Sequence, residues 1–208
     1  MQLLLATRNA HKTREFRQLL GKDFEVTDLG AFPNVALPEE TGRTFEDNAR
    51  LKARAVARAL AMTSHGDVPT LVLADDSGLE VDCLGGAPGI FSARYAGENA
   101  TDKQNIDKLL AALKRIGAAD ASRRAARFRC VLALASEGKI LRTFSGTVEG
   151  AIVDLPRGCN GFGYDPVFVP NGSGETFAEM PAHIKNEISH RARAVQALRA
   201  AINSGKWT

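Results

Sequence analysis

The sequence predicts an α/β domain in which helices pack in layers against a sheet, and three patterns support this prediction. Short apolar runs with strand-like alternation occur along the chain, amphipathic stripes at helical spacing separate them, and clusters of glycine and proline stand between these segments. Alternating strands and helices are typical of layered α/β folds. With 208 residues and 44% hydrophobic content, the chain can bury a full core, so we expect a single two-lobed domain over residues 1–208.

The N-terminal elements are expected to be a strand over residues 2–6, the loop Thr7–Lys12 and a helix. One face of this helix carries Phe16, Leu19 and Leu20. Backbone N–H groups at the start of a helix suit a phosphate, particularly beside a lysine, and Thr7 and Asn9 can add side-chain hydrogen bonds. The loop lacks the glycines of a Walker A or dinucleotide motif, so an ordinary loop with a surface lysine is the alternative.

A long second helix is expected after an irregular connection that contains two prolines. Thr44 fits an N-cap, with Asp47 three residues later in the capping-box position. A cap is a sufficient explanation of Asp47, and Lys52 fits a solvated helix face. The helix is expected to end near residues 62–64. Its apolar stripe comprises Phe45, Ala49, Ala53, Val56, Ala57 and Leu60.

Two adjacent acids, Asp75 and Asp76, follow the apolar run of residues 70–73 and are expected to lie where a strand ends. Consecutive side chains of a strand point to opposite faces, so only one of the pair can easily face a given site. Ser77 and Gly78 fit a tight turn after the strand. Carboxylates in such a place can hold a hard cation such as Mg²⁺, whereas the alternative is a plain turn.

The central part of the chain is expected to contain a strand over residues 79–84, a turn-rich loop over residues 85–89, and a helix that a capping box opens at Thr101. The apolar stripe of that helix comprises Ile106, Leu109, Leu110, Leu113 and Ile116. Alternation then indicates a strand around residues 127–134 and one or two strands over residues 139–153.

A glycine-rich aromatic loop, residues 158–166, is expected before a short strand over residues 167–169 and a final helix. Phe162 and Tyr164 flank Gly163, an arrangement that can sandwich a flat heterocycle. Entry of both rings into the core is the alternative and is the more usual fate of aromatic residues. The apolar side of the final helix comprises Ile188, Ala192, Val195, Leu198 and Ile202.

Composition excludes several classes of protein. A net charge of +3 permits a polyanionic small ligand but is too small for a protein that coats nucleic acid, and the arginines of residues 123–129 fit solvated surface better than an RNA-binding patch. No stretch approaches the roughly 20 apolar residues of a membrane span. Three widely spaced cysteines, with no CxxC pair, suggest neither a disulfide framework nor a zinc site, so we expect a reducing cytoplasm.

Six segments stand in order along nearly the whole chain: ATRNAHK (residues 6–12), TFEDNARLKA (44–53), ADDSGL (74–79), GGAPGIFSARY (85–95), GFGYDP (161–166) and ISHR (188–191). Together they resemble motifs of the ITP/XTP pyrophosphatase family, whose members hydrolyse non-standard purine nucleoside triphosphates. One short motif proves little, whereas six in family order argue against chance.

The resemblance implies an elongated mixed β-sheet with flanking helices and two lobes around a central cleft. It implies a homodimeric hydrolase that converts ITP, dITP or XTP to the nucleoside monophosphate and pyrophosphate. Mg²⁺ is the implied cofactor, a purine nucleoside triphosphate is the implied substrate, and neither a nucleic-acid polymer nor a membrane is an expected partner. The sequence does not rank the three substrates.

The resemblance also assigns roles to residues of this chain. Asp76 matches the proton acceptor and a metal ligand. Asp47 matches the second metal position, which is usually glutamate. Aspartate is one methylene shorter, so Asp47 would reach Mg²⁺ through water, with direct contact as the alternative. Arg8 stands where relatives often have glycine, and His11 also departs from the common pattern. Contacts with substrate are implied for Thr7, Arg8, Asn9, Ala10, His11, Lys12, Lys52, Ser77, Phe162, Gly163, Tyr164, Asp165, Lys185, His190 and Arg191.

Two other kinds of function stay open at this point. A nucleotide kinase is disfavoured, since the chain has no Walker A glycine pattern. A nucleotide-sensing or RNA-binding module could use the same phosphate loop and aromatic residues without chemistry. Taken without the resemblance, Lys185, His190 and Arg191 fit an ordinary surface cluster near the last helix.

Overall fold

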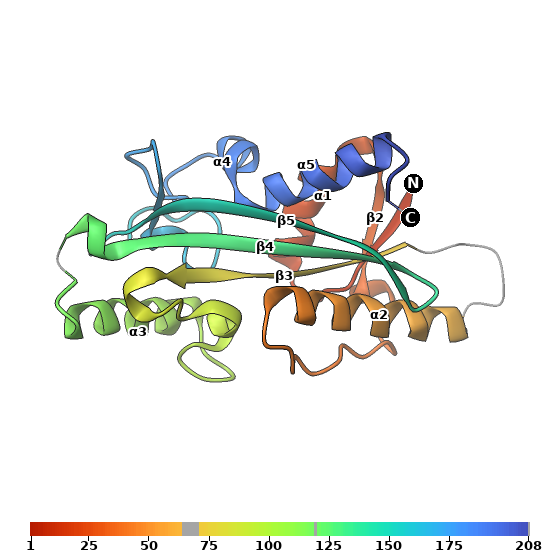
Figure 1. Ribbon diagram of the computed structural model, residues 1–208, viewed down its shortest axis with the longest axis horizontal. Coiled ribbons are helices and arrows are strands. Elements are labelled where there is room, and N and C mark those ends of the chain that lie inside the picture. The colour runs from red at the N-terminus through yellow and green to blue at the C-terminus, as the bar shows by residue number, and fades with distance from the viewer. Residues whose placement is uncertain (64–70, 119, 208) are drawn as a thin grey trace. The chain divides into compact units, whose positions relative to one another are not determined.

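The computed structural model describes residues 1–63, 71–118 and 120–207, and it confirms the predicted mixed α/β fold (Figure 1). Within these residues a six-stranded sheet has the order β2-β1-β3-β4-β5-β6. Strand β1 pairs in parallel with β2 and β3, whereas β5 and β6 pair antiparallel. The strands are β1 (Gln2–Leu5), β2 (Glu25–Asp28), β3 (Leu71–Val81), β4 (Ala125–Ser136), β5 (Lys139–Ile152) and β6 (Phe168–Pro170). The helices are α1 (Ala10–Leu20), α2 (Phe45–Thr63), α3 (Asp102–Arg115), α4 (Ala182–Ile188) and α5 (His190–Asn203).

The chain divides into two compact units, and the division falls within the three strands β3, β4 and β5. Unit 1 comprises Met1–Asp76, Cys130–Gly146 and Arg191–Thr208. Unit 2 comprises Ser77–Arg129 and Thr147–His190. Each unit is built around its own cluster of buried hydrophobic residues.

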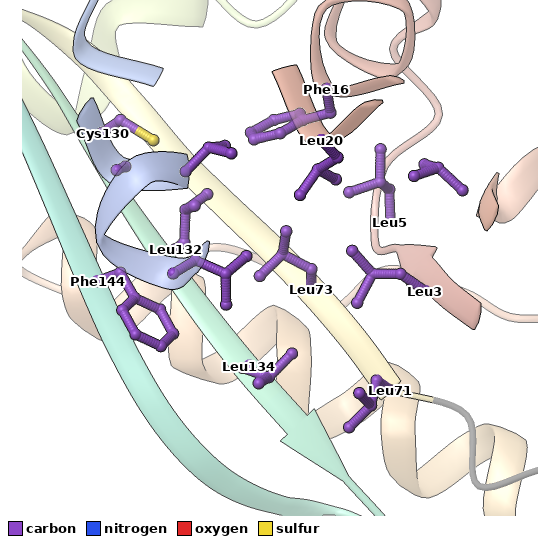
Figure 2. Packing of buried hydrophobic residues seen from close by; sticks show 14 of the residues in the cluster. Leu3, Leu5, Phe16, Leu20, Leu71, Leu73, Cys130, Leu132, Leu134 and Phe144 are labelled. Carbon is purple, nitrogen blue, oxygen red and sulfur yellow. The ribbon is translucent and has the colours of Figure 1, made fainter. Parts of the chain in front are cut away.

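The main core of unit 1 lies between one face of the sheet and helices α1 and α5, and α2 covers the other face (Figure 1). Figure 2 shows leucines of β1, β3 and β4 in one cluster with Phe16 and Leu20 of α1. The strand residues of this cluster alternate along the chain, as expected for side chains that share one face of a sheet. They include Leu3, Leu5, Leu71, Leu73, Cys130, Leu132 and Leu134.

Helix α2 begins directly after Thr44, as the sequence predicts. The backbone N–H of Asp47 donates to the Thr44 hydroxyl at 3.1 Å, which is the expected N-cap bond. The predicted apolar stripe of α2 is buried, and Asn48 and Lys52 are buried with it. Because buried polar groups need hydrogen-bond partners, these two side chains indicate a polar contact at the helix–sheet interface of unit 1. The helix runs to Thr63, and residue 64 lies outside the described residues.

Strand β3 departs from the prediction. The tight turn expected at Ser77 and Gly78 is wrong, because one strand runs from Leu71 through the acidic pair to Val81. Asp75 and Asp76 therefore lie inside a strand instead of at its end. Gly78 is buried inside this continuous strand. A glycine weakens a strand without ending it, so its presence did not require a turn.

Unit 2 confirms the capping box at Thr101, where both reciprocal hydrogen bonds are present. Its core contains the buried residues of α3 and three packed rings, Phe128, Phe168 and Phe177. The single final helix predicted from residue 188 onward is wrong. Two helices, α4 and α5, meet at Ser189, whose extended backbone (φ −66°, ψ 162°) interrupts the helical path.

The arginines after α3 are used within unit 2. The prediction of solvated surface is wrong for Arg124, which is buried and pairs with Asp154 at 2.6 Å. Arg127 and Arg129 pair with Glu80, and Arg127 also contacts Asp82. This ion pairing disfavours an RNA-binding role for these arginines.

Among the helices that the structure describes, none combines the length and apolar character needed to cross a membrane.

Replacing Leu73 tests the core of unit 1. We expect Leu73→Ala to lower the free energy of unfolding by about 2–5 kcal/mol, because the side chain is fully buried and truncation leaves a cavity. Leu155→Ala, at a leucine that is 74% exposed, is the control and should change stability by less than about 0.5 kcal/mol. Urea unfolding measures both, and equal losses would contradict this description of the core.

Candidate active site

The two adjacent acids of β3 point to opposite faces of the sheet, as strand geometry requires. Asp75 lies on the face that carries Leu71 and Leu73, where α1 and α5 pack. Asp76 lies on the face covered by α2. The sequence analysis predicted that only one acid could serve a given site, and each acid indeed has its own set of partners within unit 1.

Asp76 is held by two residues of α2. Lys52 Nζ donates to Asp76 Oδ1 at 2.8 Å, and Asn48 Nδ2 donates to Oδ2 at 3.3 Å. The same Lys52 ammonium donates to Glu40 Oε1 at 2.8 Å. Asn48 and Lys52 are four residues apart, so both project from the same face of the helix.

Burial and charge set the protonation of this group. Burial raises the pKa of Asp76 above its ordinary value, and the Lys52 ammonium only partly opposes this shift. Burial disfavours the charged form of Lys52, but the carboxylates of Asp76 and Glu40 outweigh this effect and raise its pKa. Lys52 therefore stays cationic, and Asp76 is a stronger base than an exposed aspartate.

Two carboxylates that meet at one ammonium offer ligands suited to a divalent cation. Asp76 and Glu40 both present hard oxygen ligands to the same region, and Mg²⁺ commonly uses one or two carboxylates with water and phosphate oxygens. In the described ranges no group of three or more His, Cys, Asp or Glu side chains is placed to hold a metal. A fully protein-made cation site is thus not indicated there.

Asp47 lies at the exposed start of α2, where its carboxylate accepts the Thr44 hydroxyl at 2.8 Å. The capping role given as the plain alternative is therefore present, and its metal role stays a prediction. Sequence reasoning missed Glu40. The available signal was an acidic residue just before Gly42 and the N-cap, in a connection that looked irregular.

Asp75 holds two of the predicted substrate-binding cations. Lys12 of α1 forms a short ion pair with Asp75 Oδ1, and Arg191 Nε lies 3.5 Å from Oδ2. Arg191 also pairs with Glu15 at 2.8 Å. Burial would raise the pKa of Asp75, but Lys12 and Arg191 outweigh it and hold that pKa well below the usual range. Asp75 is consequently a permanent carboxylate.

The loop before α1 is organised by its own side chains. Asn9 is the N-cap, and its Oδ1 accepts the backbone N–H groups of His11 and Lys12 at 2.9 and 3.2 Å. The Thr7 hydroxyl accepts the N–H of Asn9 at 3.1 Å. Ala10 and His11 are exposed at the start of the helix. The helix N-terminus that was predicted to bind phosphate is therefore formed, and Asn9 accepts hydrogen bonds from two of its backbone N–H groups.

Arg8 is engaged with the protein backbone. Its guanidinium donates to the carbonyl oxygens of Leu29, Pro33 and Val35, at 3.1, 3.1 and 2.9 Å. These bonds fasten the segment that follows β2 to the loop before α1. Arg8 therefore has a structural use, and its predicted contact with substrate stays a prediction.

In unit 2 the aromatic loop is fixed by two carboxylates. Asp165 Oδ2 accepts the N–H of Phe162 at 2.9 Å and the Lys185 ammonium at 2.7 Å. Asp102, at the start of α3, accepts the N–H of Gly163 at 2.7 Å. The Lys185–Asp165 pair is buried, and Lys185 Nζ lies 5.3 Å from the centroid of the Phe162 ring.

The idea of a sandwich between Phe162 and Tyr164 needs correction. Tyr164 is buried in the core of unit 2, where its hydroxyl donates to the Ser92 carbonyl at 3.0 Å. Burial raises the pKa of this phenol. The ring cannot stack on a ligand from there, whereas Phe162 is half-buried. His190 stacks on Phe128 at 4.7 Å between ring centroids.

Seven of the predicted site residues thus gather in three places. In unit 1, Lys12 and Arg191 meet at Asp75, and Lys52 meets Asp76 and Glu40. In unit 2, Phe162 and Lys185 meet at Asp165. Ser77 is half-buried in β3 directly after Asp76.

Replacing Arg8 tests its structural use. Arg8→Ala removes three hydrogen bonds to backbone carbonyls, so we expect about 1–2 kcal/mol of lost stability and faster hydrogen exchange in residues 29–35. Arg14→Ala, an exposed arginine of α1, is the control and should alter neither quantity appreciably. Unchanged exchange of residues 29–35 in Arg8→Ala would show that the bonds do not fasten this segment.

Replacing Lys185 tests the buried ion pair of unit 2. We expect Lys185→Met to lower the free energy of unfolding by about 3–5 kcal/mol, because the buried Asp165 carboxylate loses its counter-ion. Lys103→Met is matched in chemistry, but Lys103 is exposed, so its pair with Asp107 should contribute less than about 0.5 kcal/mol. Urea unfolding measures the free energy of unfolding of both variants. Similar losses of stability would show that the buried pair contributes no more than the exposed one.

Comparison with known proteins agrees with this arrangement of the chain. A dITP/XTP pyrophosphatase of Bacillus licheniformis is 45% identical over 206 residues, which cover 97% of this chain and 98% of that protein. A dITP/XTP pyrophosphatase of Bacillus subtilis is 46% identical over 198 residues, covering 95% and 94%. The solved structure of a HAM1 protein from Coxiella burnetii has a TM-score of 0.82 at 41% identity, covering 98% and 99%.

The family model described as "Ham1 family" matches residues 3–201, which include every predicted site residue. This match extends over nearly the whole sequence, in agreement with the six ordered motifs. The chain belongs to the Ham1 family.

Proposed function

We propose that this protein hydrolyses non-standard purine nucleoside triphosphates, namely ITP, dITP and XTP, to the nucleoside monophosphate and pyrophosphate. The observation that carries the proposal is the buried Asp76 carboxylate, which shares the Lys52 ammonium with Glu40. Relatives at 45–46% identity that are named dITP/XTP pyrophosphatases support it. Removal of such nucleotides from the nucleotide pool is the expected role.

The reaction joins a water oxygen to the α-phosphorus and breaks the bond between that phosphorus and the oxygen bridging to the β-phosphorus. Asp76 takes the proton of the attacking water, and its raised pKa makes it a better base near neutral pH. Pyrophosphate leaves with the bridging oxygen. Lys52 and Lys12 donate hydrogen bonds to phosphate oxygens and stabilise the charge that develops on the leaving group.

Both lysines are already placed against carboxylates, which fixes their positions before substrate arrives. An ammonium has three donors, and within the described residues Lys52 gives two of them to Asp76 and Glu40. The third donor suits a phosphate oxygen. Lys12, bound to Asp75, is held at the start of α1 beside the loop predicted to receive phosphate.

Mg²⁺ fits this donor set, and Asp76 and Glu40 are the residues we expect to hold it, with Asp47 as the second position that the sequence predicted. When bound, the ion would neutralise phosphate charge and orient the attacking water. The fit is based on two carboxylates that converge on Lys52. Water and substrate oxygens would supply the remaining ligands, as is usual for this ion.

Selection of the base is assigned to donors directed at position 6 of the purine. Such a donor can donate a hydrogen bond to a 6-oxo group but not to the 6-amino group of adenine, which would leave the donor unpaired. Lys185, His190 and Arg191 are the predicted donors, and the half-buried Phe162 is the ring proposed to stack on the base. The Asp165 carboxylate orients both Lys185 and the Phe162 amide.

We also infer a cytoplasmic homodimer. Among the described residues no disulfide joins Cys83, Cys130 or Cys159, which is compatible with a reducing compartment. The dimer rests on the family resemblance alone. Light scattering of the pure protein gives its mass directly, and a value near the 22.3 kDa of one chain would refute the dimer.

Asp76→Asn tests the proposed base. We expect pyrophosphate release from ITP to fall by about 10²–10⁴-fold, because the amide cannot accept the proton of water, while circular dichroism stays that of the folded protein. Asp107→Asn, at an exposed acid of α3, is the control and should retain full activity. Substantial turnover by Asp76→Asn would show that Asp76 is not the base that takes the proton of water.

The same assay separates the competing functions. Wild-type protein should release pyrophosphate from ITP, dITP and XTP much faster than from ATP or GTP, and chelation with EDTA should stop the reaction. A sensor would bind ITP without cleaving it. An RNA-binding module would instead bind RNA in a salt-dependent manner and leave ITP intact.

A further inference from the structure

Asn48 is a buried polar residue to which the proposed chemistry gives no task. Its side chain is completely buried in the first turns of α2, among the apolar residues of the stripe. It makes two hydrogen bonds in different directions. Oδ1 accepts the backbone N–H of Gly42 at 2.8 Å, and Nδ2 donates to Asp76 Oδ2 at 3.3 Å.

These two bonds need a side chain that both accepts and donates a hydrogen bond, and the amide of asparagine does both. A carboxylate only accepts hydrogen bonds, and a backbone N–H only donates, so the group between them must offer one acceptor and one donor. Aspartate at position 48 would bring a second carboxylate against Asp76, and leucine would leave Gly42 and Asp76 without this partner. An unmade bond at a buried group is costly, so the site strongly favours asparagine.

The residue on the other side of Asn48 is equally constrained. A Cβ added to Gly42 would lie 2.5 Å from Asn48 Oδ1 and 2.6 Å from Asp47 Cβ, so only glycine lets the backbone approach the amide so closely. Gly42 is two residues from Glu40, whose carboxylate shares Lys52 with Asp76. Asn48 therefore connects the segment that carries Glu40 to the strand that carries Asp76.

We propose that Asn48 is a positioning residue, which fixes the Asp76 carboxylate and the Gly42 backbone relative to each other and so keeps Glu40 and Asp76 together on Lys52. The proposal deepens the proposed function and rests on it for the roles of the two acids. The hydrogen-bond bridge itself is a separate structural claim, which can be tested whether or not the protein hydrolyses ITP.

An exchange of the two side chains tests the bridge. Asn48→Asp places two carboxylates in contact, so we expect the Gly42 amide to exchange its hydrogen at least about tenfold faster than in the wild type. The double variant Asn48→Asp with Asp76→Asn restores one amide and one carboxylate in reversed order. The new amide on β3 can then donate to the new carboxylate on α2 and accept from Lys52, while that carboxylate accepts the N–H of Gly42. Exchange at Gly42 should therefore return to within about threefold of wild type.

Activity should respond differently from structure. We expect kcat for ITP to fall at least about tenfold in Asn48→Asp with a smaller change in KM, because the base is displaced. The double variant should regain protection of Gly42 but not turnover, since it lacks the carboxylate at position 76. If Asn48→Asp does not fold, recovery of a folded protein in the double variant gives the same support.

Asn105 provides a matched control in unit 2. It is also buried, accepts the N–H of Ala96 at 2.8 Å and donates to the Ala93 carbonyl at 3.2 Å, so it joins two backbone groups where Asn48 joins a backbone group to an acid. Asn105→Asp should lower stability without changing kcat or the exchange of Gly42. Similar losses of kcat in Asn48→Asp and Asn105→Asp would overturn the positioning role.

Failure of the double variant to regain protection at Gly42, or to fold, would also overturn the proposal. These outcomes are distinct from failure of the proposed function. If wild-type protein released no pyrophosphate from ITP, the exchange measurements would still decide whether Asn48 bridges Gly42 and Asp76.

Discussion

Strand β3 is buried on both faces of the sheet within unit 1, and the polar arrangement of this unit follows from that constraint. The alternation of a strand sends neighbouring side chains to opposite faces, so Asp75 and Asp76 cannot share one environment. Each buried carboxylate must then find its own cation. Helices α1 and α5 supply Lys12 and Arg191 on one face, and α2 supplies Lys52 on the other.

The two acids consequently differ in character although they are adjacent in sequence. Asp75 faces two cations, which keep it ionised. Asp76 has one lysine, which it shares with Glu40, and burial prevails to raise its pKa. A carboxylate with a raised pKa suits proton transfer, whereas a permanently ionised one suits the positioning of cations. The environment therefore gives the two acids opposite pKa shifts, and the raised pKa of Asp76 suits the role of base proposed for it.

Regular patterns in the sequence predicted most of the fold. The capping residues Thr44 and Thr101 gave the starts of α2 and α3, and the alternation around Cys130 indicated β4. The turn at Ser77 and Gly78 was wrong because local propensity favours a turn there, while pairing with neighbouring strands keeps the segment extended. The break at Ser189 was missed because the apolar spacing continues from Ile188 into α5.

Site residues could be predicted where they belong to a recognisable sequence motif. They could not be predicted where the role of a side chain depends on contacts with residues far away in the sequence. Resemblance to family motifs selected Asp76 and Lys52, which the structure brings within 2.8 Å. Glu40 lies in an irregular connection, and no sequence spacing reveals that its carboxylate meets Lys52. Tyr164 illustrates the same difficulty, since only tertiary packing shows that its ring enters the core.

The division of labour between the adjacent acids is the central claim, and parallel measurement of Asp75→Asn and Asp76→Asn tests it most directly. Both the free energy of unfolding and the rate of pyrophosphate release from ITP should be determined for each variant. We predict that Asp75→Asn loses the more stability, because Lys12 and Arg191 lose a shared carboxylate, and that Asp76→Asn loses the more turnover. The claim would be contradicted if the two variants lost equal turnover and equal stability. It would also be contradicted if Asp75→Asn lost more turnover and Asp76→Asn more stability.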